Sequence, residues 1–120
     1  MQVDVGQCTV QEIGEILDMA KLDPSSIDDM QFVDVREQWE VEIASLPKFV
    51  VLPLSSFNDW SPKISQILDP EKETLVLCHH GIRSMQASQY LVQNGFKRVR
   101  NIAGGIDAYS RGVNNNVPTY

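Results

Sequence analysis

The sequence has 120 residues, of which 42% are hydrophobic and 22% charged, and it carries a net charge of −6 at pH 7. This length suits one domain with its own core, and the acidic balance argues against general binding to nucleic acid or to an anionic membrane. No apolar run approaches the ~20 residues of a membrane-spanning helix, and the first residues do not resemble a signal peptide. The two cysteines, Cys8 and Cys78, are far apart in the chain, so we expect no disulfide framework and a cytoplasmic location. An organelle, reached with a targeting peptide that is then removed, stays open.

The first part of the chain is expected to hold a surface helix and a buried strand. Thr9 and Glu12 have the spacing of a capping box, and apolar side chains then recur at helical intervals. Residues 22–30 are rich in serine and aspartate, which predicts a loop with at most one helical turn. Residues 31–35 are typical of a buried strand. Cys8 has neither a glycine-rich loop nor a basic partner beside it, so we expect a structural thiol.

The following segment is expected to alternate short helices with one strand. The pattern predicts a helix over residues 37–42, a strand over 49–52, and one or two short helices over 55–68. The two tryptophans, Trp39 and Trp60, are expected to be packing anchors, because such side chains bury a large apolar area.

A short apolar run, residues 74–77, leads into a polar loop that opens a helix over residues 82–94, and Cys78 stands at this junction. A helix N-terminus favours an anion, and thiolates in such places have pKa values lowered from about 8.5. Gly81 lets the loop turn sharply, and Arg83 adds a permanent positive charge. A lone cysteine at a strand end is otherwise a small buried hydrophobe. The glycine and arginine at these offsets favour a reactive thiolate.

The last part of the chain is expected to return to the sheet once more. Gly95 is expected to end the preceding helix as a left-handed cap, and a strand over residues 99–103 and a helix over 106–110 follow. Residues 113–120 are expected to form a tail that frays. The helix over residues 82–94 is expected to pack on the sheet through a face of mostly small residues, Ser84, Ala87, Ser88 and Leu91. A small basic cluster is expected at a solvated strand edge, formed by Lys97, Arg98 and Arg100.

The alternation of strands and helices predicts an α/β fold with a parallel sheet that helices cover on both faces. No internal repeat or linker divides the chain. One domain is therefore expected.

Three motifs resemble those of the rhodanese family of sulfurtransferases. The family's active-site loop pattern, C-x-x-G-x-R-[ST], is matched by Cys78-His79-His80-Gly81-Ile82-Arg83-Ser84. Its Asp-Val-Arg-Glu segment is matched by Asp34-Val35-Arg36-Glu37, and its late Gly-Gly motif by Gly104-Gly105-Ile106-Asp107-Ala108-Tyr109. The resemblance implies a three-layer fold, with a mostly parallel five-stranded sheet and helices on both faces. Order and spacing fit a single domain over residues 1–120, with a core of about 7–118.

The resemblance also implies a reaction. The Cys78 thiolate takes the outer sulfur of a small anionic donor such as thiosulfate, and a thiophilic acceptor, cyanide, a thiol or an acceptor protein, removes it from the persulfide. Asp34 is implied to support the site and Arg36 to help position the donor. No cofactor, metal ion, nucleic acid or membrane partner is expected. The persulfide-binding loop is implied to comprise His79, His80, Gly81, Ile82, Arg83 and Ser84.

Several readings remain open. His79 and His80 could line the mouth of the pocket, or one of them could act as a general base that takes a proton. A metal site is disfavoured because only Cys78 and two adjacent histidines are in view. Asp34 and Arg36 could form a merely exposed ion pair. Ser45 and Lys48 stand where the family usually has histidine and glycine, which leaves the turn before residue 49 in doubt, and Tyr109 stands where it usually has tryptophan.

Two other classes of protein compete with the sulfurtransferase interpretation. Cysteine-based phosphatases and arsenate reductases use a similar thiolate but space it as C-x5-R, whereas Cys78 and Arg83 give C-x4-R. The tighter loop suits one sulfur atom better than phosphate. The alternative we keep is a rhodanese-like module for sulfur relay, sensing or partner binding, for which thiosulfate turnover is not the main task.

Overall fold

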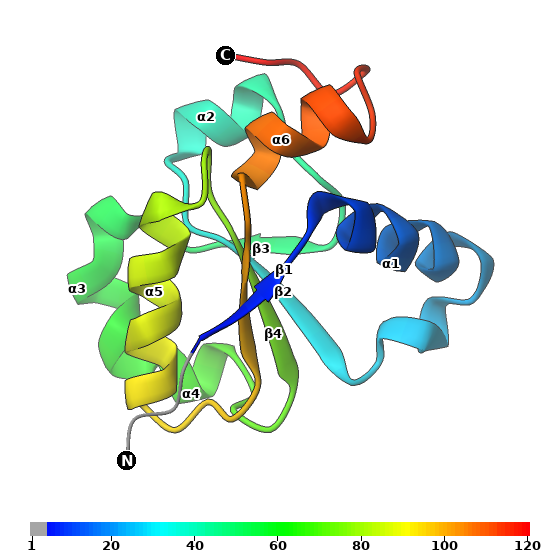
Figure 1. Cartoon of the computed structure of the whole chain (residues 1–120). Helices are drawn as coiled ribbons and strands as arrows, with labels where there is room; N and C mark the ends of the chain where they lie inside the picture. The colour runs from blue at the N-terminus through cyan, green and yellow to red at the C-terminus, as the bar shows by residue number, and fades with distance from the viewer. Residues whose placement is uncertain (1–4) are drawn as a thin grey trace.

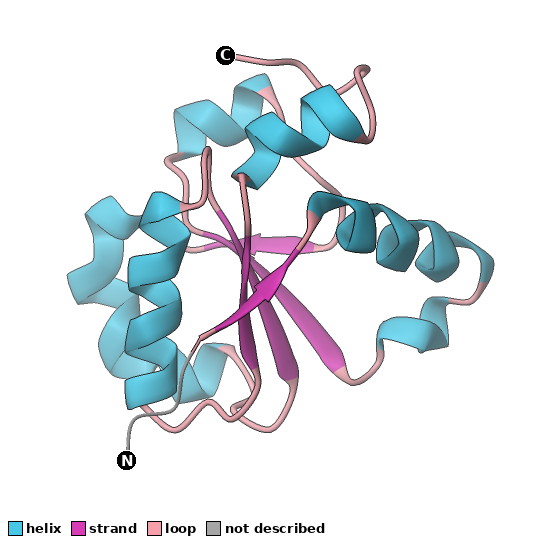
Figure 2. Ribbon diagram, viewed as in Figure 1, coloured by secondary structure: helices cyan, strands magenta, loops and turns pink. Residues whose placement is uncertain are grey.

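The computed structural model describes residues 5–120, and the first four residues lie outside the description. Helices stand on both sides of a central twisted sheet (Figures 1 and 2). The five strands are all parallel and follow the order β1-β5-β4-β2-β3. The predicted three-layer α/β fold is therefore confirmed, and the sheet is entirely rather than mostly parallel. The strands are β1 (Gly6–Cys8), β2 (Met30–Asp34), β3 (Phe49–Val51), β4 (Glu73–Leu77) and β5 (Val99–Ile102).

The helices divide between the two faces of the sheet. α1 and α6 pack on one face, and α3, α4 and α5 cover the other, as the two groups of buried apolar side chains show. Short 3-10 turns lie at Pro24–Ile27, Leu54–Ser56 and Ser61–Lys63. The helices are α1 (Val10–Leu22), α2 (Gln38–Ile43), α3 (Phe57–Trp60), α4 (Ile64–Ile67), α5 (Ile82–Gln93) and α6 (Gly105–Gly112).

Strand alternation decides which layer each side chain joins. In β4, Leu75 and Leu77 point into the core under α1 and α6, whereas Val76 and the next inward residue, Cys78, join the core under α5. This follows from the two-residue period of a strand. Cys78 therefore leaves the sheet on the same side as the helix that its loop opens.

Local signals fixed several helix ends as expected. Thr9 and Glu12 form the predicted capping box at the start of α1, and Gly95 takes a left-handed conformation after α5, with φ +92°. The short strand β1 carries no such signal and was not predicted. It pairs at the sheet edge with β5, and it buries Cys8 completely.

The turn before β3 keeps an unusual shape. Lys48 adopts a left-handed backbone conformation with φ +76°, and among the described residues it is the one non-glycine residue with positive φ. Glycine takes this conformation without strain, while an L side chain pays for it in local crowding. The turn that Lys48 left in doubt is therefore formed with lysine in a glycine-like conformation.

No helix among residues 5–120 has both the length and the apolar character needed to cross a membrane.

Candidate active site

Cys78 lies at the carboxyl end of β4, where the chain turns into α5. Its side chain is 1% exposed. The main-chain N–H of Gly81 donates to Cys78 Sγ at 3.0 Å, and the hydroxyl oxygen of Ser84 lies 3.2 Å from the same sulfur. Gly81 has φ +97°, a left-handed conformation that would strain any side chain. The buried sulfur thus has two polar neighbours from its own loop.

A small hydrogen-bond network fixes the Ser84 hydroxyl. Ser84 Oγ donates to Asn101 Oδ1 through a very short contact, and Asn101 Nδ2 donates to the carbonyl oxygen of Gly81 at 3.1 Å. Asn101 belongs to β5 and is 3% exposed. It therefore joins the middle and the helical end of the Cys78 loop to the neighbouring strand. The role of Asn101 was not predicted from the sequence, although a polar side chain inside an apolar strand is a recognisable signal of a buried polar contact.

Arg83 braces the loop against α2. Its two Nη nitrogens donate to the two carboxylate oxygens of Glu40, each at 2.7 Å. The Glu40 side chain is 4% exposed, and the paired guanidinium lowers the pKa of Glu40 to about 2 against a desolvation that opposes it. The same contact raises the pKa of Arg83. The bracing role expected for Arg83 therefore has a definite partner, one that the sequence analysis did not name.

Asp34 and Arg36 form a buried pair at the end of β2. Arg36 is fully buried, and its guanidinium donates to both carboxylate oxygens of Asp34, with the shortest contact at 2.7 Å. It also donates to the carbonyl oxygens of Glu40 and Ala44. The reading as an exposed ion pair is wrong. The expected contact of Arg36 with a donor anion lacks support as well, because its donors are turned inward to hold α2.

The C-terminal segment covers the loop rather than fraying. The Tyr120 ring stacks on the His79 ring with centroids 3.9 Å apart and an angle of 4°. The Tyr120 hydroxyl accepts from Arg36 Nη1 and donates to Glu40 Oε1, both at 3.0 Å. The predicted frayed tail is therefore wrong. The partners of Tyr120 lie far from it in the sequence, so no local sequence pattern predicts its position.

The two histidines of the loop differ in environment. His79 is half-buried, and burial together with the neighbouring His80 lowers its pKa. The His80 side chain is 58% exposed, and its Nδ1 lies 3.8 Å from Asp107 Oδ2. Neither histidine has a hydrogen bond to Cys78 among the contacts of the described residues. The structure therefore offers no direct support for a general base acting on the thiol.

The Gly104-Gly105 pair lets the start of α6 pack closely against the loop of Cys78. The N–H groups of Ile106 and Asp107, in the first turn of α6, donate to the carbonyl oxygens of Cys78 and His79 at 2.9 and 3.1 Å. A Cβ atom on Gly105 would lie 2.5 Å from the Cys78 carbonyl oxygen and closer still to that of His79. Only glycine permits this approach, so the Gly-Gly motif supports the loop that carries Cys78.

Two apolar side chains stand exposed near this loop. Ile82 is 73% exposed and Trp39 is 59% exposed, with the Trp39 ring set edge-on to Tyr120 at 6.3 Å. The prediction that Trp39 is a packing anchor is wrong, since α2 turns this residue outward. Trp60 is 7% exposed and donates to the Pro53 carbonyl oxygen, so its predicted role as a packing anchor is confirmed.

The second cysteine provides a contrast within the same chain. Cys8 is fully buried, and its Sγ lies 3.8 Å from a carboxylate oxygen of Glu12. Burial, with the nearby Glu12 charge, raises the pKa of Cys8 to about 11. A thiol with such a pKa is a poor nucleophile at neutral pH. The structural role expected for Cys8 fits this environment.

This fold and site define a class of protein: an α/β domain with a cysteine at a strand-to-helix turn and a loop that an arginine braces. The family model of the rhodanese-like domain matches residues 16–111. The chain belongs to the rhodanese-like domain family.

Curated relatives are longer than this chain. Rhodanese-like/PpiC domain-containing protein 12, chloroplastic, of Arabidopsis thaliana is 54% identical over 98 residues, which are 82% of this chain and 33% of that protein. A tRNA uridine(34) hydroxylase of Photorhabdus laumondii is 34% identical over 85 residues, 69% of this chain and 24% of that protein. The chain thus spans a third or less of the length of these two relatives.

Among solved structures, the single domain sulfurtransferase RDL2 of Saccharomyces cerevisiae superposes with a TM-score of 0.76, covering 98% of each chain at 19% identity. At this identity the likeness establishes the shared fold alone.

Proposed function

We propose that this domain is a sulfurtransferase that carries a sulfane sulfur as a persulfide on Cys78. The observation that carries the proposal is the pair of polar groups at the sulfur, the Gly81 amide at 3.0 Å and the Ser84 hydroxyl at 3.2 Å. The Gly81 N–H is a donor of the kind that stabilises a negative sulfur in a site shielded from water. The Ser84 hydroxyl donates to Asn101 in this structure and can add to this stabilisation only by turning to the sulfur. The start of α5 adds further amides without intrahelical partners and the positive end of a helix dipole.

The reaction has two displacement steps. In the first, the Cys78 thiolate attacks the outer sulfur of thiosulfate, a new S–S bond forms, and sulfite leaves with the electron pair of the old one. In the second, cyanide or a thiolate attacks the outer sulfur of the persulfide, and the electron pair of that S–S bond returns to Cys78. No external oxidant or reductant is needed. The product is thiocyanate or a new persulfide, and the enzyme thiolate is restored.

Arg83 has a supporting part in this scheme. Both of its Nη nitrogens are held by Glu40, so it fixes the loop and contributes positive field instead of shuttling a proton. Buried Arg36 holds α2, the helix of Glu40, by donating to the carbonyl oxygens of Glu40 and Ala44. The small partners in this proposal are thiosulfate as donor and cyanide or a thiol as acceptor.

Intact-mass spectrometry after treatment with thiosulfate tests the persulfide. We expect a gain of about one sulfur mass on the wild-type chain, removed again by cyanide. The gain should be absent from Cys78→Ser and unchanged in Cys8→Ser, the matched control with the buried thiol. An adduct on Cys8, or none on a folded wild-type chain, would overturn the proposal.

A second candidate is a rhodanese-like module for relay, sensing or partner binding. It is favoured by the short share of the curated relatives that this chain spans, one of which is named a hydroxylase. In that case the persulfide would form but steady-state thiosulfate turnover would stay slow, with faster transfer to a protein acceptor. The name of the Arabidopsis relative makes a chloroplast the alternative to the cytoplasmic location expected from the sequence.

A further inference from the structure

The fold brings a third possible metal ligand to the two adjacent histidines. His79 and His80 follow Cys78 in the loop, and Asp107 lies in the first turn of α6. One ligand atom from each of the three residues lies within 4.8 Å of the other two. A metal site was disfavoured from the sequence because only Cys78 and the two adjacent histidines were in view, and the packing of α6 against the loop supplies a further, well-spaced ligand.

His79 offers a nitrogen that the protein leaves unused. Its Nε2 atom is buried and has no hydrogen-bond partner within the part of the chain that the structure describes. A buried polar atom without a partner costs free energy, because it has lost its hydrogen bonds to water and gained none in return. The ring cannot easily turn away, since it lies between the rings of Tyr120 and His80, with both centroid distances 3.9 Å. A ligand that accepts a nitrogen lone pair would satisfy this atom.

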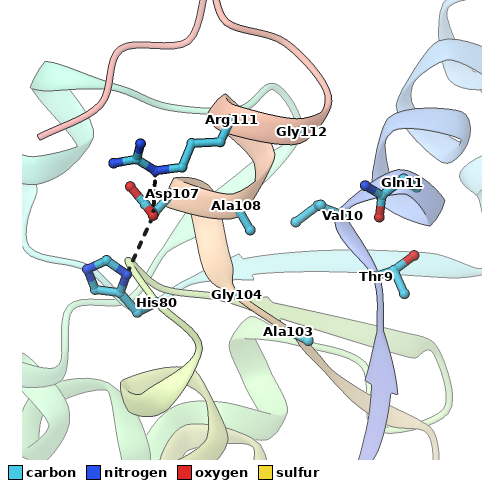
Figure 3. Close-up of a pocket in the computed structure, with 10 residues that line it drawn as sticks. All are labelled: Thr9, Val10, Gln11, His80, Ala103, Gly104, Asp107, Ala108, Arg111 and Gly112. Carbon is cyan, nitrogen blue, oxygen red and sulfur yellow. Dashed lines mark hydrogen bonds and ion pairs between the residues drawn. The ribbon is translucent and has the colours of Figure 1, made fainter.

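Asp107 is held in a way that suits a ligating carboxylate. Arg111 Nε donates to Asp107 Oδ2 at 3.0 Å, and His80 Nδ1 faces the same oxygen, as Figure 3 shows. No hydrogen bond to the other oxygen, Oδ1, occurs within residues 5–120. Metal-bound carboxylates are commonly oriented by such an outer hydrogen bond. The Arg111 charge opposes a cation, but that side chain is 68% exposed and thus well screened.

Two of the three residues, His80 and Asp107, also have open space beside them. His80, Asp107 and Arg111 line one side of an open pocket of about 620 Å³, whose other wall includes Thr9 and Gln11 (Figure 3). A bound ion could therefore keep a water molecule or small anion as a further ligand.

We propose that His79, His80 and Asp107 form a binding site for a divalent transition-metal ion of the zinc class. Two imidazole nitrogens and one carboxylate oxygen are the donor set of open zinc sites, in which a fourth position stays with water. Ligand atoms around a tetrahedral zinc ion lie roughly 3.4 Å apart, whereas the three groups lie within 4.8 Å of one another, so they must close by up to roughly 1.4 Å on binding. The exposed His80 side chain is free to make this movement.

The site is independent of the proposed sulfur chemistry and can be tested without it. Titration of Co²⁺ into the tag-free Cys78→Ser chain is expected to give one bound ion with visible d–d absorption. No near-ultraviolet thiolate band should accompany it, because Cys8 is buried. Asp107→Asn and His80→Asn should each weaken binding by about tenfold or more. Asp18→Asn, which alters another helical aspartate paired with a basic residue, should leave it unchanged.

NMR of the histidine ring signals gives a second measurement of binding, on a chain in which His79, His80 and Asp107 are all intact. The chain has only two histidines, so Zn²⁺ should shift both sets of ring signals and saturate them at one equivalent. Absence of saturable binding, or binding that Asp107→Asn and Asp18→Asn affect equally, would overturn the proposal. Because the Cys78→Ser chain cannot carry a persulfide, these results do not depend on whether sulfur transfer occurs.

Discussion

Arg83 and Glu40 form a two-pronged contact, with each Nη nitrogen of the arginine 2.7 Å from a different carboxylate oxygen. The pair joins the loop of Cys78 to α2, and the low exposure of Glu40 shields it from solvent. Such bidentate pairs add geometric specificity to charge. The position of the loop is therefore linked to the ionisation of a residue on another element.

This link predicts a loss of stability in acid. The pKa of Glu40 is lowered from 4.5 to about 2, so the folded state binds the proton less readily than the unfolded chain. The associated stability is fully present above about pH 4.5 and is lost as the pH falls toward 2. At about 1.4 kcal/mol for each pH unit of the difference, the ceiling is about 3 kcal/mol, reduced by screening at the partly exposed Arg83.

Urea unfolding at pH 7 and pH 3 measures this contribution. Glu40→Gln should lower the free energy of unfolding at pH 7 and flatten its fall between the two pH values. Glu42→Gln, at an exposed position on the same helix, serves as the control. Equal slopes for wild type and Glu40→Gln would contradict the assignment.

Ser84 gives a prediction about rate. If a persulfide forms on Cys78, Ser84→Ala removes a hydroxyl 3.2 Å from the sulfur. The hydroxyl donates to Asn101 in this structure, so we expect it to turn to the sulfur when the persulfide is charged. A hydrogen bond to a charged group contributes about 1.5–3 kcal/mol, so its loss should slow sulfur transfer by about tenfold or more.

The matched control for Ser84 is Ser88→Ala. Ser88 is equally buried on α5, but its hydroxyl donates to the Ser84 carbonyl oxygen instead of contacting the sulfur. Rates are measured on folded protein at saturating thiosulfate. Similar rates for the two variants would remove the Ser84 hydroxyl from the reaction.

The Cys78 loop was predictable because its signals are local. An apolar strand, a turn glycine and a helix start lie within a few residues of one another, and their order determines where Cys78 emerges. The same holds for the capping box at Thr9 and for the left-handed Gly95. These features depend on backbone preferences that the neighbouring residues state directly.

The partners of the loop were not predictable because they come from distant parts of the chain. Glu40 reaches Arg83 across 43 positions, and Tyr120 reaches Arg36 across 84. Their sequence neighbourhoods show only a short helix and a polar tail. The prediction for Trp39 was wrong for a related reason, since the composition of a helix as short as α2 does not reveal which of its faces is covered.

Gly105 gives a prediction in which strain and steric overlap can be separated. Gly105→Ala places a Cβ within 2.5 Å of the Cys78 carbonyl oxygen, on a backbone with φ +62°. We expect a loss of more than about 2 kcal/mol in the free energy of unfolding, because main-chain atoms must move. Chemical denaturation measures it.

Gly95→Ala is the control for backbone strain alone. Gly95 has φ +92°, and a Cβ there meets nothing within 4 Å. Its cost should stay near the 1–2 kcal/mol that a left-handed conformation costs an L residue. If Gly95→Ala were as destabilising as Gly105→Ala, the close approach of α6 to the loop would not explain the glycine pair.

Tyr120 gives the prediction that follows from the packed C-terminal segment. Tyr120→Phe keeps the ring that stacks on His79 but removes the hydroxyl shared by Arg36 and Glu40. Since both partners are charged and part of a buried network, the free energy of unfolding should fall by about 1–3 kcal/mol. Tyr120→Ala should cost more, because it also removes the ring. Asn115→Ala, at an exposed position of the same segment, should change stability by less than about 0.5 kcal/mol. Urea denaturation distinguishes these cases, and a Tyr120→Phe chain as stable as the wild type would mean that the tail is frayed in solution, as its sequence alone predicts.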